Sequence, residues 1–157
     1  MRFYQINPQT IGWVGDDAVE EDMEARPVII HKLQIDLEFW PDDDLVEAGL
    51  YGYCGTTKLM RAIKEAELTG VDFDKVEVIE GEQFFIQRKS HPNTELPELH
   101  WFKFYTGIPG TDDFGLLTGP VTSPLVVSEK ALVLLKSFNH QKMEIKGFDK
   151  DLLSSSV

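Results

Sequence analysis

A stretch of strict alternation at residues 28–39 constrains the fold of this chain more than any other feature. The apolar residues there are Leu33, Ile35, Leu37 and Phe39, and the polar residues between them are Lys32, Gln34, Asp36 and Glu38. A period of two places the apolar side chains on one side of an extended strand. Pro41 follows and cannot donate a hydrogen bond to a ladder, so the strand ends before it. The pattern predicts a sheet with one face in a core and the other in water.

Other segments extend this sheet. Shorter apolar or aromatic runs predict strands near residues 1–6, 75–79, 83–88, 99–105, 125–127 and 143–148. Gly81 separates two of them and predicts a hairpin turn. Residues 107–124 contain four glycines and three prolines, which predicts a loop.

Two helices are predicted, over residues 57–68 and 129–138. Thr56 or Thr57 can cap the first helix and Ser128 the second, because a hydroxyl oxygen there accepts a bond from an unpaired backbone N–H. Apolar residues recur at helical spacing in both segments, which predicts one face in the core. Gly70 is expected to close the first helix in the left-handed conformation.

The two helices share a short motif. Thr56-x-Lys58-x-Met60-x-x-Ile63-Lys64 resembles Ser128-x-Lys130-x-Leu132-x-x-Leu135-Lys136. The motif indicates either a duplicated strand–helix–strand unit or a chance similarity between two amphipathic helices. A chain of 157 residues has the length of about one domain. We therefore expect a single α+β domain over residues 1–150, with a mostly antiparallel sheet and two main helices, and a frayed tail over residues 151–157.

The charge of the chain excludes some partners and favours others. The sequence has 15 basic and 27 acidic residues, a formal net charge of −12. This balance argues against binding to nucleic acid or to an anionic membrane surface, since both require Lys and Arg. It leaves open a basic partner, or a charge that only keeps the protein soluble. Cys54 is the single cysteine, and the first eight residues carry no apolar signal core. We expect a cytoplasmic protein without an intrachain disulfide.

No residue pattern predicts a reaction, a metal or a cofactor. The four histidines are far apart in the sequence and lack the spacing of metal ligands. Cys54 precedes a helix start, which can activate a thiol, but the sequence identifies no base for it, and a buried structural cysteine is the simpler interpretation. Two acidic segments remain as candidate partner contacts: Asp16, Asp17, Glu20, Glu21, Asp22, Glu24, Asp112 and Asp113. The first segment also fits a solvated loop, and Asp112 also fits a turn that it stabilises itself.

Several motifs in residues 50–140 carry a family resemblance. They are Leu68-Thr69-Gly70-Val71, Val76-Glu77-Val78, Leu96-Pro97, Gly110-Thr111-Asp112-Asp113-Phe114 and Leu125-Val126-Val127-Ser128-Glu129-Lys130-Ala131. In these motifs the chain resembles immunity proteins of bacterial polymorphic toxin systems, which are encoded beside the toxin that they neutralise. The resemblance implies a protein that binds a toxin domain and covers its active site, without catalysis of its own. The motifs are caps, turns and core strands, so they carry over no binding residue.

The charge then suggests a toxin with a basic surface, and aromatic residues such as Trp13, Trp40 or Trp101 would anchor the centre of the interface. The neighbours of Trp101 instead predict a place in the core. Two other functions stay open. One is a small enzyme centred on Cys54 or a histidine, and the other is a homo-oligomeric assembly protein that pairs through an exposed strand edge.

Overall fold

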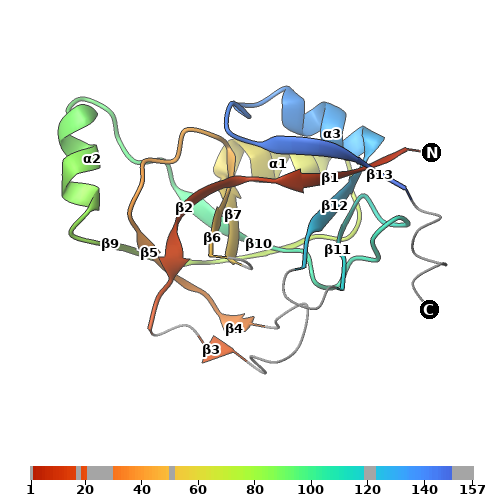
Figure 1. Ribbon diagram of the computed structural model, residues 1–157, viewed down its shortest axis with the longest axis horizontal. Helices are drawn as coiled ribbons and strands as arrows, with labels where there is room; N and C mark the ends of the chain where they lie inside the picture. Colours follow the sequence, from red (N-terminus) through yellow and green to blue (C-terminus); the bar gives the residue numbers. More distant parts are fainter. Residues whose placement is uncertain (1, 17–18, 21–29, 50–51, 119–122, 150–157) are drawn as a thin grey trace.

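The computed structural model describes residues 2–16, 19–20, 30–49, 52–118 and 123–149 (Figure 1). The strands in these ranges are β1 (Phe3–Asn7), β2 (Gln9–Val14), β3 (Val19–Glu20), β4 (Ile30–Lys32), β5 (Gln34–Leu37), β6 (Leu45–Ala48), β7 (Gly52–Thr56), β8 (Asp72–Asp74), β9 (Glu77–Glu80), β10 (Leu99–Lys103), β11 (Phe114–Leu116), β12 (Leu125–Ser128) and β13 (Glu144–Phe148). The helices are α1 (Thr57–Glu65), α2 (Phe84–Ser90) and α3 (Glu129–Lys136). The predicted α+β class is confirmed.

The strands form two main sheets. A four-stranded sheet has the order β11-β12-β1-β13, and all its pairs are antiparallel. A seven-stranded sheet has the order β8-β10-β7-β6-β2-β5-β9, and its pairs are antiparallel except β2 with β6 and β5 with β9. The strands β3 and β4 pair separately. The prediction of mostly antiparallel pairing is therefore confirmed, although the strands divide between sheets.

Two parts of the fold are topologically equivalent. In one, the antiparallel pair β6–β7 leads into α1 and then β8, and β10 lies between β7 and β8. In the other, the pair β11–β12 leads into α3 and then β13, and β1 lies between β12 and β13. All of these pairs are antiparallel. This arrangement favours the interpretation of the sequence motif as a duplicated unit, with β1 supplied from the start of the chain.

Both predicted helix caps are present. The Thr56 hydroxyl oxygen accepts the backbone N–H of Leu59 at 3.4 Å, and the Ser128 oxygen accepts that of Ala131 at 3.1 Å. The aspartate Asp44 fixes the first cap, because its Oδ1 accepts the Thr56 hydroxyl at 2.7 Å. Its Oδ2 accepts the backbone N–H of Asn139, beyond α3, at 2.9 Å. Asp44 thereby connects the start of α1 to the segment that follows α3.

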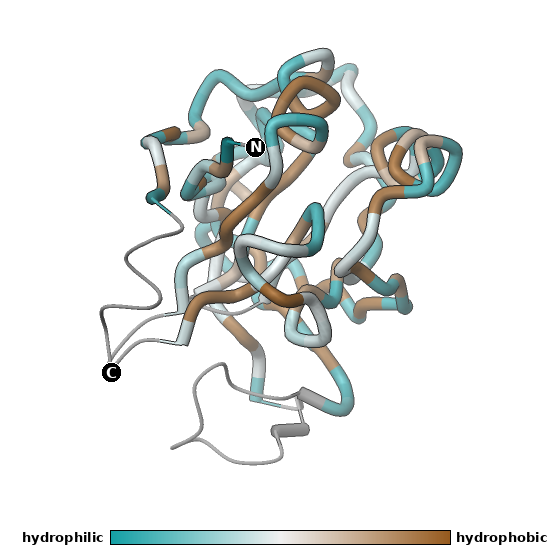
Figure 2. The backbone as a smooth tube through the Cα atoms, turned by 90° about the vertical axis from the view of Figure 1, so that its right-hand side faces the viewer, coloured by the Kyte–Doolittle hydropathy of each residue, from teal (hydrophilic) through white to brown (hydrophobic). Residues whose placement is uncertain are grey.

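The two faces of the seven-stranded sheet contact different cores. The first core lies between this sheet, α1, α3 and the four-stranded sheet, and includes Leu59, Phe102 and Leu135. The second lies on the opposite face and includes Trp40 and Phe84, whose rings stack with centroids 5.7 Å apart. Figure 2 shows hydrophobic segments running through the inner strands, whereas many bends at the periphery are hydrophilic. Central strands therefore bury both faces, which simple alternation does not reveal.

Three predicted segments differ from the structure. The long strand at residues 28–39 is divided at Leu33 into β4 and β5, and Phe39 lies beyond β5 with its side chain exposed. Residues 83–88 are predicted as a strand after a hairpin, but residues 84–88 belong to the helix α2. In this helix Phe84 packs on Trp40, a tertiary contact that the local run of apolar residues does not reveal, because the β-propensity of a short segment depends on its context. The predicted loop at residues 107–124 contains the strand β11.

Gly70 does not close α1. Glu67 adopts the left-handed conformation there, with φ 55°, and the Leu68 N–H bonds the carbonyl of Ile63 at 3.3 Å. Gly70 has φ 87° three residues later, where an added Cβ would lie 2.0 Å from the Phe114 carbonyl oxygen. A close backbone approach therefore requires this glycine, and the helix end uses a strained residue instead. The predicted tail at residues 151–157 lies outside the described residues.

Candidate functional site

Most of the first acidic segment lies beyond what the structure describes. Asp17, Glu21, Asp22 and Glu24 lie outside the described residues, and only the backbone of Glu20 is described, in β3. Asp16 is described, and its side chain is exposed. The role of this segment in partner binding stays a prediction.

Asp112 and Asp113 both make hydrogen bonds within the fold. The Asp112 Oδ2 accepts the backbone N–H of Ile108 at 2.7 Å, the turn that the sequence allowed as its alternative role. The Asp113 Oδ1 accepts the Ser128 hydroxyl at 2.6 Å, and its Oδ2 accepts the N–H of Thr69 at 2.9 Å. Asp113 thus connects the start of α3 to the segment after α1. Asp44 makes the equivalent connection between the start of α1 and the segment after α3. These bonds assign both carboxylates a structural role beside any contact with a partner.

Cys54 does not have the environment of a nucleophile. Its side chain is fully buried in the second core, whereas α1 covers the opposite face of the sheet. Burial raises the pKa of the Cys54 thiol above its ordinary value, which disfavours the reactive thiolate. Three of the histidines contact neighbours. His100 Nε2 lies 2.8 Å from the Thr57 hydroxyl, His91 stacks on Trp40, and His140 Nδ1 lies 2.8 Å from the Phe138 carbonyl oxygen.

Exposed apolar side chains lie on both faces of the sheet near the edge strand β9. We call Trp13, Phe39, Ile79, Phe85 and Ile86 the β9 surface; they are between 42% and 70% exposed. In the strand registers Trp13 lies opposite Asp36, and Asp36 lies opposite Ile79. Opposed residues point to the same face of a sheet. Trp13 and Ile79 therefore lie on one open face. Phe85 and Ile86 lie on α2, which follows β9 and whose Phe84 packs into the second core on the opposite face, and Phe39 follows the end of β5 (Figure 1).

The strand β9 is the last strand of its sheet order. Its outer backbone groups have no strand beside them within the described chain, and such an edge can pair with another protein. Two ion pairs lie along it, Lys32 with Glu77 at 3.5 Å and Arg88 with Glu80. Trp40 and Trp101, by contrast, are buried, so Trp13 is the exposed tryptophan.

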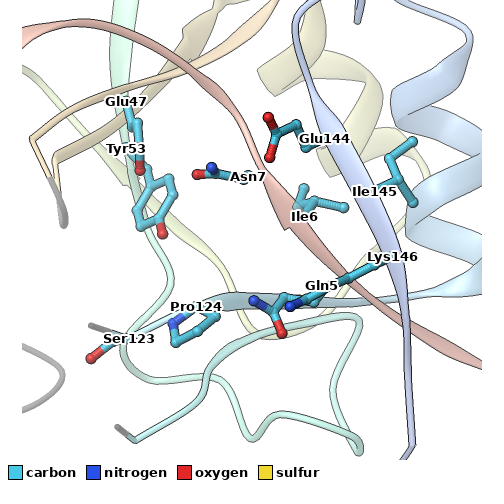
Figure 3. A pocket seen from close by; sticks show the side chains of 10 residues that line it. All are labelled: Gln5, Ile6, Asn7, Glu47, Tyr53, Ser123, Pro124, Glu144, Ile145 and Lys146. Atoms are coloured by element: carbon cyan, nitrogen blue, oxygen red, sulfur yellow. The ribbon is translucent and has the colours of Figure 1, made fainter. Parts of the chain in front are cut away.

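A pocket of about 390 Å³ lies between the two main sheets (Figure 3). Its lining comes from β1, β6, β7, β13 and the residues before β12: Gln5, Ile6, Asn7, Glu47, Tyr53, Ser123, Pro124, Glu144, Ile145 and Lys146. The strands β6 and β7 place Glu47 directly opposite Tyr53, and Figure 3 shows the two side chains together on one side of the pocket. Glu144 and Ile145 lie on the β13 side.

Glu47 is an unusual residue for an interior. It is 6% exposed, and its Oε1 accepts the Thr10 hydroxyl at 3.2 Å. Burial raises the pKa of Glu47 to about 7, although the Thr10 hydrogen bond partly opposes this shift. Burial, together with the nearby charge of Glu47, also raises the pKa of Tyr53. A carboxyl group that titrates near neutrality in a pocket is a candidate for ligand binding or proton transfer.

Sequence reasoning missed both the pocket and most of the β9 surface. The pocket residues come from segments that are far apart in the chain, and Glu47 looks like one more acid among 27. Only the position of Glu47 in Leu45-Val46-Glu47-Ala48, an otherwise apolar run, could have indicated a buried carboxylate.

Within the described residues, no group of three or more His, Cys, Asp or Glu side chains could hold a metal ion. None of the helices in the described ranges is long and apolar enough to cross a membrane. Comparison with known proteins yields no match, whether with family models, with curated proteins or with solved structures.

Proposed function

We propose that this chain is an immunity protein, which binds a cognate bacterial toxin domain and neutralises it by covering its active site. The observation that carries the proposal is the β9 surface. Exposed apolar side chains beside an unpaired sheet edge favour protein association there, whereas single exposed residues are common on any surface. An exposed tryptophan is also the type of residue in which binding energy concentrates.

Two further observations support the proposal. The net charge of −12 favours a basic partner, such as a toxin whose cleft binds nucleic acid or nucleotides. The resemblance of residues 50–140 to immunity proteins also favours a bacterial toxin domain as the partner. The buried position of Cys54 offers no support for the enzyme alternative centred on that thiol. We place the protein in the cytoplasm, where it would protect the producing cell.

The decisive experiment uses the toxin domain encoded beside this chain. Its enzymatic activity is assayed with and without an equimolar amount of the protein, and binding is titrated by calorimetry. We expect inhibition and a dissociation constant in the nanomolar range or tighter, which corresponds to about −12 kcal/mol. If the toxin domain keeps full activity under excess protein, the proposed function is wrong.

Variants then test the surface separately from the function. Trp13→Ala should weaken binding at least about 30-fold, the effect of an interface residue that contributes 2 kcal/mol. Val133→Ala is the matched control, because Val133 is 67% exposed but lies on α3, away from the β9 surface. Asp16→Asn tests the acidic segment in the same assay. If all three variants bind the toxin domain as tightly as the unsubstituted protein does, the interface lies elsewhere on the protein, although the proposed function still holds.

The strand edge also permits a second copy of the chain as occupant. Light scattering of the free protein distinguishes this case. A doubled mass that returns to the monomer value in Trp13→Ala would assign the β9 surface to self-association rather than to a toxin.

A further inference from the structure

The pocket between the two sheets combines a buried carboxylate with a lining that suits a particular kind of ligand. Besides Glu47, the lining includes the side-chain amides of Gln5 and Asn7 and the apolar side chains of Ile6 and Ile145, and Gln5 and Ile145 lie across the pocket from Glu47 (Figure 3). The pocket volume of about 390 Å³ is within the range of small-ligand sites. A flexible aliphatic group with a cationic end fits such a lining, because the stem contacts apolar atoms and the charged end reaches the carboxylate.

The charge of Glu47 is not balanced inside the fold. None of the ion pairs formed within the described residues includes it. A buried carboxylate without a cation is costly to ionise, and an entering cation regains the attraction that the fold does not supply. The other charged or titratable groups of the lining are Tyr53 on β7 and Glu144 and Lys146 on β13. Glu144 adds negative charge, and Lys146 is exposed.

Ser123 is a second buried polar residue of the lining. It is 6% exposed, and its hydroxyl has no hydrogen-bond partner within the described residues. Figure 3 shows its oxygen turned away from Glu47, so Glu47 is the group that would recognise a charge in this pocket.

From this geometry we propose that the pocket binds an alkylguanidinium or alkylammonium group, held by Glu47. The cation belongs either to a small molecule or to an Arg or Lys side chain of another protein. This inference is independent of the proposed immunity function, since the pocket residues are not part of the β9 surface.

The test uses n-butylguanidinium as the probe and n-butylurea, which has the same shape without the charge, as its control. Binding is followed by NMR through the backbone signals of Asn7 and Tyr53 in the complete chain. We expect n-butylguanidinium to bind and n-butylurea to bind at least about tenfold more weakly, because a hydrogen bond to a charged group is the stronger kind. Equal binding of both probes, or no binding of either, would overturn the proposal.

Variants assign the binding to the carboxylate. Glu47→Gln removes the charge and should weaken n-butylguanidinium binding at least about tenfold. Glu129→Gln, which removes an exposed carboxylate of α3 outside the pocket, should leave the affinity unchanged. Glu47→Gln should fold, since Gln resembles the protonated form of Glu47. With the original sequence, affinity should rise roughly tenfold from pH 6 to pH 8, as Glu47 becomes ionised. An affinity that is the same in Glu47→Gln as in the original chain would refute the assignment.

A third probe distinguishes the two sources of the cation. N-acetylarginine amide carries the backbone that an Arg side chain of another protein would bring. If it binds as n-butylguanidinium does, the pocket accepts a protein side chain; if its backbone prevents binding, the ligand is a small molecule. Both results support the cation site.

Discussion

The substitution Asp44→Ala gives the sharpest test of how the two helical units are held together. Asp44 is 3% exposed, and its two carboxylate oxygens accept the Thr56 hydroxyl at 2.7 Å and the Asn139 N–H at 2.9 Å. A hydrogen bond to a charged group contributes about 1.5–3 kcal/mol. The loss of both bonds should therefore lower the free energy of unfolding by about 3–6 kcal/mol.

The exposed Lys58, whose Nζ is 3.7 Å from Asp44, adds little to this figure, because surface ion pairs contribute at most about 1 kcal/mol. Asp44→Asn retains one acceptor oxygen and should lose about half as much stability. For a chain of 157 residues, about 3–6 kcal/mol corresponds to a fall in Tm of at least about 6 °C.

Urea denaturation followed by tryptophan fluorescence measures these losses. Asp42→Ala is the matched control, because Asp42 is a neighbouring aspartate with an exposed side chain and should cost less than about 1 kcal/mol. If Asp44→Ala were no more destabilising than Asp42→Ala, the connection between α1 and the segment after α3 would not stabilise the fold.

Three further predictions concern single residues. Glu67→Gly should raise the free energy of unfolding by about 0.5–1 kcal/mol in urea, because glycine adopts φ 55° without strain; a loss of stability would contradict this account of the helix end. Since burial raises the pKa of Glu47 from 4.5 to about 7, the folded state retains a proton that the unfolded state has released. Stability should therefore fall by about 3 kcal/mol as the pH rises between these values, and Glu47→Gln should remove most of this fall in matched urea titrations. Native Cys54 should react with iodoacetamide far more slowly than the unfolded chain, because it is fully buried; equal rates would show that the second core opens readily.

The helix starts and their caps could be read from the sequence because they depend on neighbours. Thr56 and Ser128 bond N–H groups three residues away, so both partners of each cap are visible in the local sequence. The strands β10, β12 and β13 were likewise predicted from local runs of apolar or alternating residues. The turn that Asp112 makes with Ile108 belongs to the same class, as a local bond across four residues.

Features that join distant segments were decided by the tertiary structure alone. Residues 84–90 form α2 rather than a strand, and Phe84 in that helix packs on Trp40, more than forty positions away in the chain. The candidate sites depend on the same kind of contact. The registers of β2, β5 and β9 place Trp13 and Ile79 on one face.

The sequence by itself determined the α+β class, the two capped helices and the excess of negative charge, because each follows from composition or from contacts between near neighbours. Only the tertiary structure decided that Glu47 is buried opposite Tyr53 at a pocket and that Asp44 connects two units. The physical reason is that the burial and the hydrogen bonds of a side chain depend on which distant segments meet. The sequence gives the identity of an acidic residue but not whether its carboxylate is solvated or buried.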